Sequence, residues 1–206
     1  DQKKNLKGLA MAAGLDAALF GRMVTSDLLA RGDAAIHVAH AITVHAEESE
    51  SDYFSAVDDL LGELAGGDEE QRGSGHINSA EINSGLFYGY VVVDVPLLVS
   101  NLEGVPREEW RDADHTLAKG VIEKLVHIIA TVSPGAKLGS TAPYSHAQCV
   151  MVESGQVQPR TLANAFQRPV SPRGDLQHNA YTSLAGFWSD HAQMYGTQND
   201  VRLSGM

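Results

Sequence analysis

The sequence predicts an α+β protein, because strand-like and helix-like segments follow one another without a regular strand–helix–strand repeat. Two segments, 36–46 and 85–95, alternate in the way that β-strands do. Two others, 106–132 and 176–195, carry apolar residues at helical spacing. With 206 residues, the chain has the length of one domain, or of one domain with an insertion.

In the N-terminal half, a strand is expected to lead into a segment of a different period. Residues 15–24, LDAALFGRMV, favour a helix on Ala and Leu propensity alone. The two faces of the strand 36–46 are expected to carry Val38, His40, Ile42 and Val44 on one side and His37, Ala39, Ala41, Thr43 and His45 on the other. After the acidic stretch 47–52, a short helix is expected to place on one face Phe54, Val57, Leu61 and Leu64.

The C-terminal half is expected to begin with a loop and to be mainly helical. Residues 65–75 are rich in Gly and charge, which is typical of a flexible loop. Pro96 is expected to end the strand 85–95. Pro106, followed by Glu108 and Glu109, opens the longest expected helix. A short apolar strand and a last amphipathic helix are expected at 147–152 and 176–195.

The charge of the chain is acidic. The net charge is −11, from 15 basic and 26 acidic residues. A protein that coats RNA places Lys and Arg against phosphates, so this balance alone argues against a free-standing nucleic-acid binder. Many of the acids lie between Glu47 and Glu70, so the local charge elsewhere differs from the total.

The cellular compartment follows from cysteine and from hydropathy. A single cysteine, Cys149, cannot form an internal disulfide, which fits a reducing cytoplasm. The apolar runs are far shorter than the roughly 20 residues that span a bilayer, and no charged-then-apolar leader opens the sequence. We therefore expect a cytoplasmic protein without a membrane partner.

Nine histidines raise the possibility of a metal site. The densest set is His37, His40 and His45. On one strand, His40 would face away from the other two, and those two would lie roughly 26 Å apart. Zinc needs ligands at about 2.0 to 2.3 Å, so satisfied strand histidines are the favoured interpretation. Recruitment of further ligands by folding stays open for Asp58, Asp59 and His76.

Other catalytic patterns are weak. His146 and Cys149 could pair as base and nucleophile, but no acid or oxyanion hole is apparent nearby. The Gly-rich stretches at 66–67 and 73–75 lack the Lys and Ser or Thr that a phosphate loop places at a helix start. No catalytic residue, metal or cofactor is predicted.

Several unusual strings occur in one order: GRMVTSD at 21–27, HAIT at 40–43 followed by His45, AVDDL at 56–60, SGLFYGY at 84–90, PGAK at 134–137 and LANAF at 162–166. Together they resemble the CasC family, the backbone subunit of the type I-E CRISPR surveillance complex, Cascade. The resemblance covers about residues 15–196. It implies an incomplete ferredoxin-like (RRM-like) palm with a protruding thumb, and it makes residues 15–24 a strand. The implied divisions are 1–45 and 85–206 for the two parts of the palm and 46–84 for the thumb.

The resemblance also implies the residues that bind RNA. The methionine of the Gly-Arg-Met motif, Met23, would contact the guide on the palm, with Arg22 beside it. Phe54 and Ile77 align with two apolar residues near the thumb tip that act as one wedge and displace a nucleotide from the stack. Lys137 aligns with the basic loop after the long helix. An apolar wedge can offset the cost of unstacking by contact with base faces.

The function that follows is that of a non-catalytic subunit. It would coat the CRISPR guide RNA beside neighbouring copies of itself and other Cascade subunits, and present the guide to target DNA. The chain would be a C-terminal fragment whose acidity reflects a missing, more basic part, so alone it should bind RNA weakly. Two alternatives stay open: a metal-dependent hydrolase using His40, His45 and nearby acids, and an acidic protein–protein scaffold.

Overall fold

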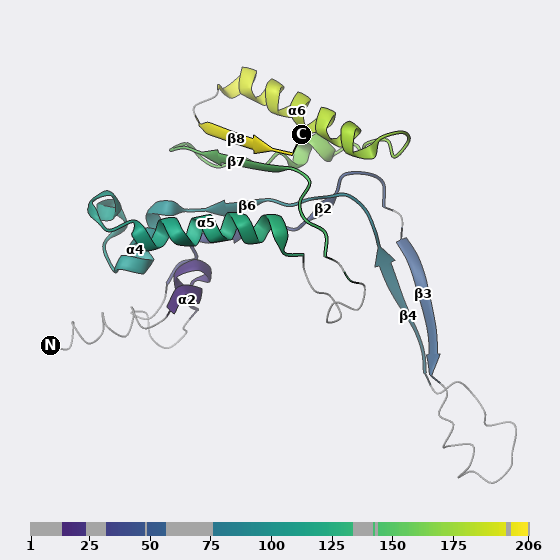
Figure 1. Ribbon diagram of the computed structural model, residues 1–206, viewed down its shortest axis with the longest axis horizontal. Helices are drawn as coiled ribbons and strands as arrows, with labels where there is room; N and C mark the ends of the chain where they lie inside the picture. The colour runs from purple at the N-terminus through teal and green to yellow at the C-terminus, as the bar shows by residue number, and fades with distance from the viewer. Residues whose placement is uncertain are drawn as a thin grey trace, which may run out of the picture. The chain divides into compact units, whose positions relative to one another are not determined.

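We describe the protein from a computed structural model, for residues 14–23, 32–47, 49–56, 76–133, 142, 144–196 and 199–205. Within these residues the strands form four two-stranded antiparallel sheets (Figure 1). The pairs are β1 Ile36–Val38 with β6 Val91–Val93, β2 Ile42–Thr43 with β5 Phe87–Tyr88, β3 Ser49–Ala56 with β4 His76–Asn83, and β7 Val150–Ser154 with β8 Asp200–Ser204. The helices are α2 Gly14–Phe20, α4 Val95–Glu103, α5 Thr116–Thr131 and α6 Leu176–Tyr195, with 3-10 turns η3 Arg107–Asp112 and η5 Ala163–Phe166. Mixed helices and small antiparallel sheets confirm the α+β class.

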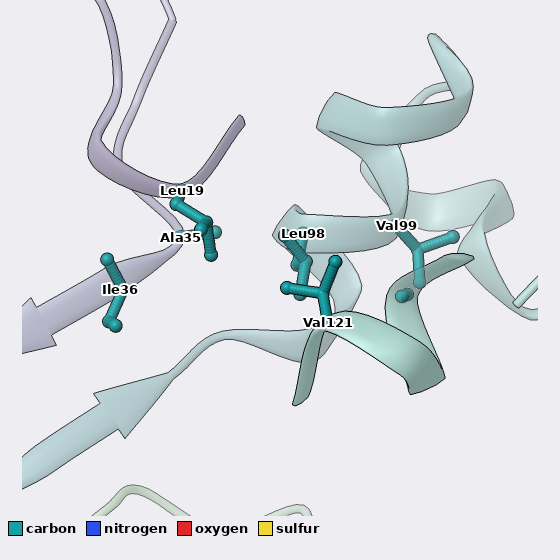
Figure 2. Close-up of a cluster of buried hydrophobic side chains, with 7 residues drawn as sticks. Leu19, Ala35, Ile36, Leu98, Val99 and Val121 are labelled. Atoms are coloured by element: carbon teal, nitrogen blue, oxygen red, sulfur yellow. The ribbon is translucent and has the colours of Figure 1, made fainter. Parts of the chain in front are cut away.

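The chain divides into two compact units, and each has its own core. Unit 1 comprises 1–40, 89–161 and 191–206. Its core joins α2, β1, α4 and α5 (Figure 2). Leu98 and Val99 of α4 are fully buried and belong to the same cluster as Val121, which with Ala118 shares one face of α5. The buried members are Leu19, Ala35, Ile36, Leu98, Val99, Ala118 and Val121.

Helix α4 begins where we expected only the end of a strand. Pro96 lies at the start of α4, where its missing N–H costs nothing. Asp94 caps this helix, since its Oδ1 accepts the Leu97 N–H at 3.0 Å. Gly104, at φ 67°, ends it with its N–H bonded to the Ser100 carbonyl. Helix α4 was not predicted, because a proline such as Pro96 can either end a strand or open a helix.

The long helix predicted from Pro106 is divided. Residues 107–112 form the 3-10 turn η3, and α5 begins only at Thr116. Asp114 lies two residues before the first residue of α5, and its Oδ1 accepts the Thr116 Oγ1–H at 2.7 Å and the Thr116 N–H at 2.9 Å. These two bonds hold the pKa of the Asp114 carboxyl below its ordinary value. Among the described helices, the 20-residue α6 is longer than the 16-residue α5.

Unit 2 comprises 41–88 and 162–190 and centres on one strand, one turn and one helix. Val44, Phe166 and Ala180 are buried together. The Tyr88 ring lies 5.6 Å from the Phe166 ring, centroid to centroid, and its hydroxyl accepts the Leu162 N–H at 3.0 Å. The paired strands β3 and β4 form a ribbon in this unit (Figure 1).

Three further expectations about secondary structure change. Residues 14–20 are helical, so propensity was right and the strand implied for 15–24 was wrong. The segment 36–46 contains two short strands, with residues 39–41 between them outside any strand. Val38 is 65% exposed while Ile36 and Val44 are buried, so burial does not follow the expected alternation.

The short helix expected from Tyr53 onward is wrong over its described part. Residues 53–56 belong to β3, which pairs with 76–79 of β4. Residues 57–75 lie outside the described residues, and with them Val57, Leu61, Leu64 and the expected loop at 65–75. The last helix, 176–195, is confirmed, and the strand expected at 147–152 is found at 150–154. No described helix is long and apolar enough to cross a membrane.

Candidate nucleic-acid interface

Residues 21–23, which we call the GRM turn, follow directly on helix α2. The Gly21 N–H bonds to the Ala17 carbonyl at 3.0 Å and ends the helix. Gly21 adopts φ +75°, a conformation that L side chains rarely adopt. A Cβ at this position would lie 2.6 Å from the Gly32 carbonyl oxygen. Only glycine therefore fits the point where the chain leaves α2.

Backbone bonds join the GRM turn to Gly32. The Arg22 N–H donates to the Gly32 carbonyl at 2.8 Å, and the Gly32 N–H donates back to Arg22 at 3.2 Å. The Asn101 side chain also joins these two parts of the chain, because its Nδ2 donates to the Ala18 and Asp33 carbonyls at 3.0 and 3.1 Å. The GRM turn is thus held at its base by main-chain bonds and by one carboxamide from α4.

Two side chains of the GRM turn reach solvent. Arg22 is exposed, and Met23 is 94% exposed. An exposed methionine offers a flexible, polarisable apolar surface, and an arginine offers five donors to phosphate. From one turn, the arginine can bind a phosphate and the methionine can contact a flat apolar surface such as a base. This is the chemistry that Arg22 and Met23 were predicted to supply.

The ribbon of β3 and β4 carries the two predicted wedge residues. Phe54 pairs with Asn78, and Ile77 pairs with Ser55. Cross-strand partners share a face and successive residues alternate, so the register places positions 54 and 77 on opposite faces of the ribbon. A wedge built from them would have one apolar residue on each side. Their role in RNA binding stays a prediction.

The fifth predicted residue, Lys137, lies outside the described residues. So do residues 134–141 around it, and its contact with phosphate stays a prediction. The division of the chain into palm at 1–45 and 85–206 and thumb at 46–84 also stays a prediction.

The histidines do not gather into a ligand set in the described part of the chain. His37 and His40 are exposed, whereas His45 is buried. Both ring nitrogens of His45 have partners: Nδ1 lies 2.7 Å from the Ala46 carbonyl, and Nε2 accepts the Leu86 N–H at 3.2 Å. A metal at His45 would have to displace one of these bonds. Among the described residues, no three His, Cys, Asp or Glu side chains lie together as a metal site would need.

Cys149 lacks the surroundings of a catalytic nucleophile. It is half-buried just before β7, and burial raises the pKa of its thiol above the ordinary value. A nucleophilic cysteine needs the opposite shift. This supports the reading of Cys149 as a packing residue.

A polar cluster in unit 1 was not predicted from the sequence. Arg160 donates to Glu153 through Nη2 at 2.9 Å, and its Nη1 lies 2.7 Å from His191 Nδ1. Asn199 Nδ2 donates to the same Glu153 at 3.0 Å. A hollow of about 260 Å³ lies beside Arg160, His191 and Tyr195. The spacing of 7 and 31 residues between partners follows no motif, so the sequence holds no signal for this cluster.

The structure is that of an α+β protein with an exposed Gly-Arg-Met turn and a paired ribbon. The chain belongs to the CT1975-like family of Cas proteins, whose model matches residues 1–205. No curated protein matches it.

Two solved structures are similar to the chain. One is a chain of a "CRISPR RNA-guided surveillance complex, pre-nicking", with 25% identity and a TM-score of 0.72 over 92% of this protein. The other is a chain of a "CRISPR RNA-guided surveillance complex", with 26% identity and a TM-score of 0.68 over 99% of this protein. This protein spans 47% of the first matched chain and 73% of the second.

Proposed function

We propose that the protein is a non-catalytic, RNA-coating backbone subunit of a type I-E CRISPR surveillance complex, of the CasC kind. The observation that carries the proposal is the structural likeness to a chain of an RNA-guided surveillance complex over 92% of this protein. The family membership over residues 1–205 agrees with it. In this proposal the chain is part of a ferredoxin-like palm, and the ribbon β3–β4 belongs to a thumb.

The geometry suits a subunit that must accept any guide sequence. Arg22 can neutralise a phosphate, and Met23 beside it can contact a base face or a ribose. Neither contact reads the hydrogen-bonding edge of a base. The edges stay free to pair with a target DNA strand, as RNA-guided recognition requires.

The proposed absence of catalysis rests on two side chains. His45 uses both ring nitrogens within the fold, and the pKa of Cys149 is raised by burial. Neither is prepared for ligation or attack. In this proposal, cutting of the target belongs to a recruited nuclease.

The acidity of the chain sets an expectation for its RNA affinity. With a net charge of −11, attraction to RNA must come from local groups such as Arg22 and from other members of an assembly. Binding to single strands weakens with salt by a slope of about 0.7 per neutralised phosphate on logarithmic scales. We therefore propose that RNA is held by the assembled complex rather than by this chain alone.

The test is co-purification of RNA with the protein expressed together with its guide and partner subunits. The purified complex should contain guide RNA that survives added nuclease. Arg22→Gln should weaken RNA retention and lower the salt slope by about 0.7 for each copy's lost phosphate contact. Arg202→Gln is the matched control, because Arg202 is an exposed arginine of β8 paired only loosely with Asp200 at 3.4 Å, and it should leave retention unchanged.

Two results would contradict the proposal. A complex that assembles and contains no RNA would support the acidic scaffold instead. Cleavage of the RNA that stops when a chelator is added would support the metal-dependent hydrolase.

A further inference from the structure

The two strands that carry the ribbon change register at its root. Val44 bonds to Leu86 through its N–H at 3.0 Å, and β3–β4 pairing begins with Ser49 opposite Asn83. Four residues, 45 to 48, therefore separate Val44 from Ser49, while two, 84 and 85, separate Asn83 from Leu86. Extra residues on one strand form a bulge, which bends the strand and interrupts its ladder.

His45 lies at the first position of this bulge and bonds across it. Since the Leu86 main-chain N–H can only donate, His45 Nε2 must be the unprotonated acceptor of the 3.2 Å bond. The proton of the neutral ring is then on Nδ1, which donates to the Ala46 carbonyl at 2.7 Å. One imidazole thus bonds to the strand entering the ribbon and to the strand leaving it.

The surroundings hold the ring in this position. His45 is 7% exposed, and the neighbouring Val44 carbonyl accepts the Val170 N–H at 2.9 Å. Gly85 lies against the imidazole, because a Cβ at residue 85 would come within 2.5 Å of His45 Nε2. The ring lies against Gly85, and its one cross-strand bond, from the Leu86 N–H, stands where the bulge interrupts the ladder.

We propose that His45 is a positioning residue, which fixes the root of the β3–β4 ribbon and so sets where the ribbon meets its nucleic acid. The inference rests on the proposed function, since only an RNA-coating subunit gives the ribbon a nucleic acid to meet. His45 touches no RNA in this account. It acts through the bond to Leu86, which joins the two arms of the ribbon where their register changes.

Two substitutions of His45 separate the two bonds of its ring. In His45→Gln, the side-chain carbonyl Oε1 stands at the distance of Nε2 and can accept the Leu86 N–H. In His45→Asn, the side chain ends one atom earlier, so the donor to Ala46 is kept and the acceptor for Leu86 is lost. Comparing the two variants therefore isolates the cross-strand bond to Leu86, because residue 45 has a polar side chain in both.

The first readout is hydrogen exchange of the Leu86 amide in the purified chain. His45→Asn should exchange this amide about tenfold faster than His45→Gln, as expected when a buried N–H loses its acceptor. In the wild-type protein, ¹⁵N chemical shifts should report an unprotonated Nε2 and a protonated Nδ1 at neutral pH. A ring with the opposite tautomer would overturn the inference.

The second readout is binding of a complementary DNA strand by the complex assembled around its guide RNA. His45→Asn should bind the strand about tenfold more weakly than His45→Gln. Gly85→Ala should resemble His45→Asn, because its methyl group displaces the ring. Gly89→Ala is the matched control, since no atom lies within 4 Å of a Cβ at residue 89, and it should bind like the wild type.

The outcomes separate this inference from the proposed function. Equal DNA binding by His45→Asn and His45→Gln, with normal guide content in both, overturns the positioning role and leaves the proposed function standing. A wild-type complex without RNA refutes the proposed function, and the inference with it.

Discussion

Replacing Gly21 with Ala is expected to destabilise unit 1 by about 2 to 5 kcal/mol. Two costs add at this position. A residue with a Cβ at φ +75° loses about 1 to 2 kcal/mol relative to a right-handed conformation. The added methyl group would also lie 2.6 Å from the Gly32 carbonyl oxygen, and such overpacking costs about 1 to 3 kcal/mol. Thermal melting measures the sum, at about 2 to 4 °C per kcal/mol for a chain of this length.

Two other glycines provide matched controls for Gly21→Ala. Gly120 lies within α5 and has no atom within 4 Å of a Cβ, so Gly120→Ala should stabilise the protein by about 0.5 to 1 kcal/mol. Gly32→Ala should be nearly neutral, because its added Cβ meets only the Arg22 nitrogen at 3.9 Å. If Gly21→Ala melts at the wild-type temperature, the GRM turn does not have the conformation described above.

Replacing both Phe54 and Ile77 with Ala is expected to impair target binding by the assembled complex far more than guide loading. Stacking of a base on an apolar or aromatic side chain contributes about 1 to 3 kcal/mol per base. The loss should fall on the regular displacement of guide nucleotides, while contacts to the guide backbone remain. Because positions 54 and 77 belong to opposite faces of the ribbon, each single variant should carry part of the effect. Binding of a complementary DNA strand, with guide content measured in parallel, checks this.

The competing explanation is that Phe54 is a packing residue. Truncation of a buried phenylalanine costs about 3 to 5 kcal/mol, which would lower the melting temperature of the free protein. The double variant Ser51→Ala with Ser79→Ala is the control, since both serines are exposed positions of the same ribbon. A large loss of stability in the Phe54 and Ile77 variant, with target binding restored once folding is rescued, would contradict the wedge.

The elements that could be predicted from the sequence are those whose pattern is local and long. The 20 residues of α6 repeat their helical period often enough to fix both ends. Helix α2 was indicated by the Ala and Leu propensity of its own residues. The resemblance misled because it transferred a strand from another family of proteins to this segment. Part of strand β3 was predicted to be helical because a few apolar residues, beginning at Phe54, have helical spacing. Its pairing with β4 is a non-local interaction that no local pattern indicates.

In the candidate site too, only features with a local sequence pattern could be predicted. Arg22 and Met23 are exposed, and their contact with RNA stays a prediction. The bond from Leu86 to His45 could not be predicted, because it joins residues 41 positions apart and depends on an unequal number of residues on two strands. From the sequence, His45 was expected only to be one of several satisfied strand histidines, and in the fold its Nε2 accepts the main-chain N–H of Leu86.

The central claim, that the exposed GRM turn contacts guide RNA, is tested most directly by site-specific crosslinking in the assembled complex. A photoreactive methionine analogue at Met23 can be compared with the same analogue at Met194, which is 73% exposed against 94% for Met23. We expect position 23 to crosslink to guide RNA at regular intervals along the spacer and position 194 not to crosslink. Crosslinking of RNA at neither position, or equally at both, would contradict it.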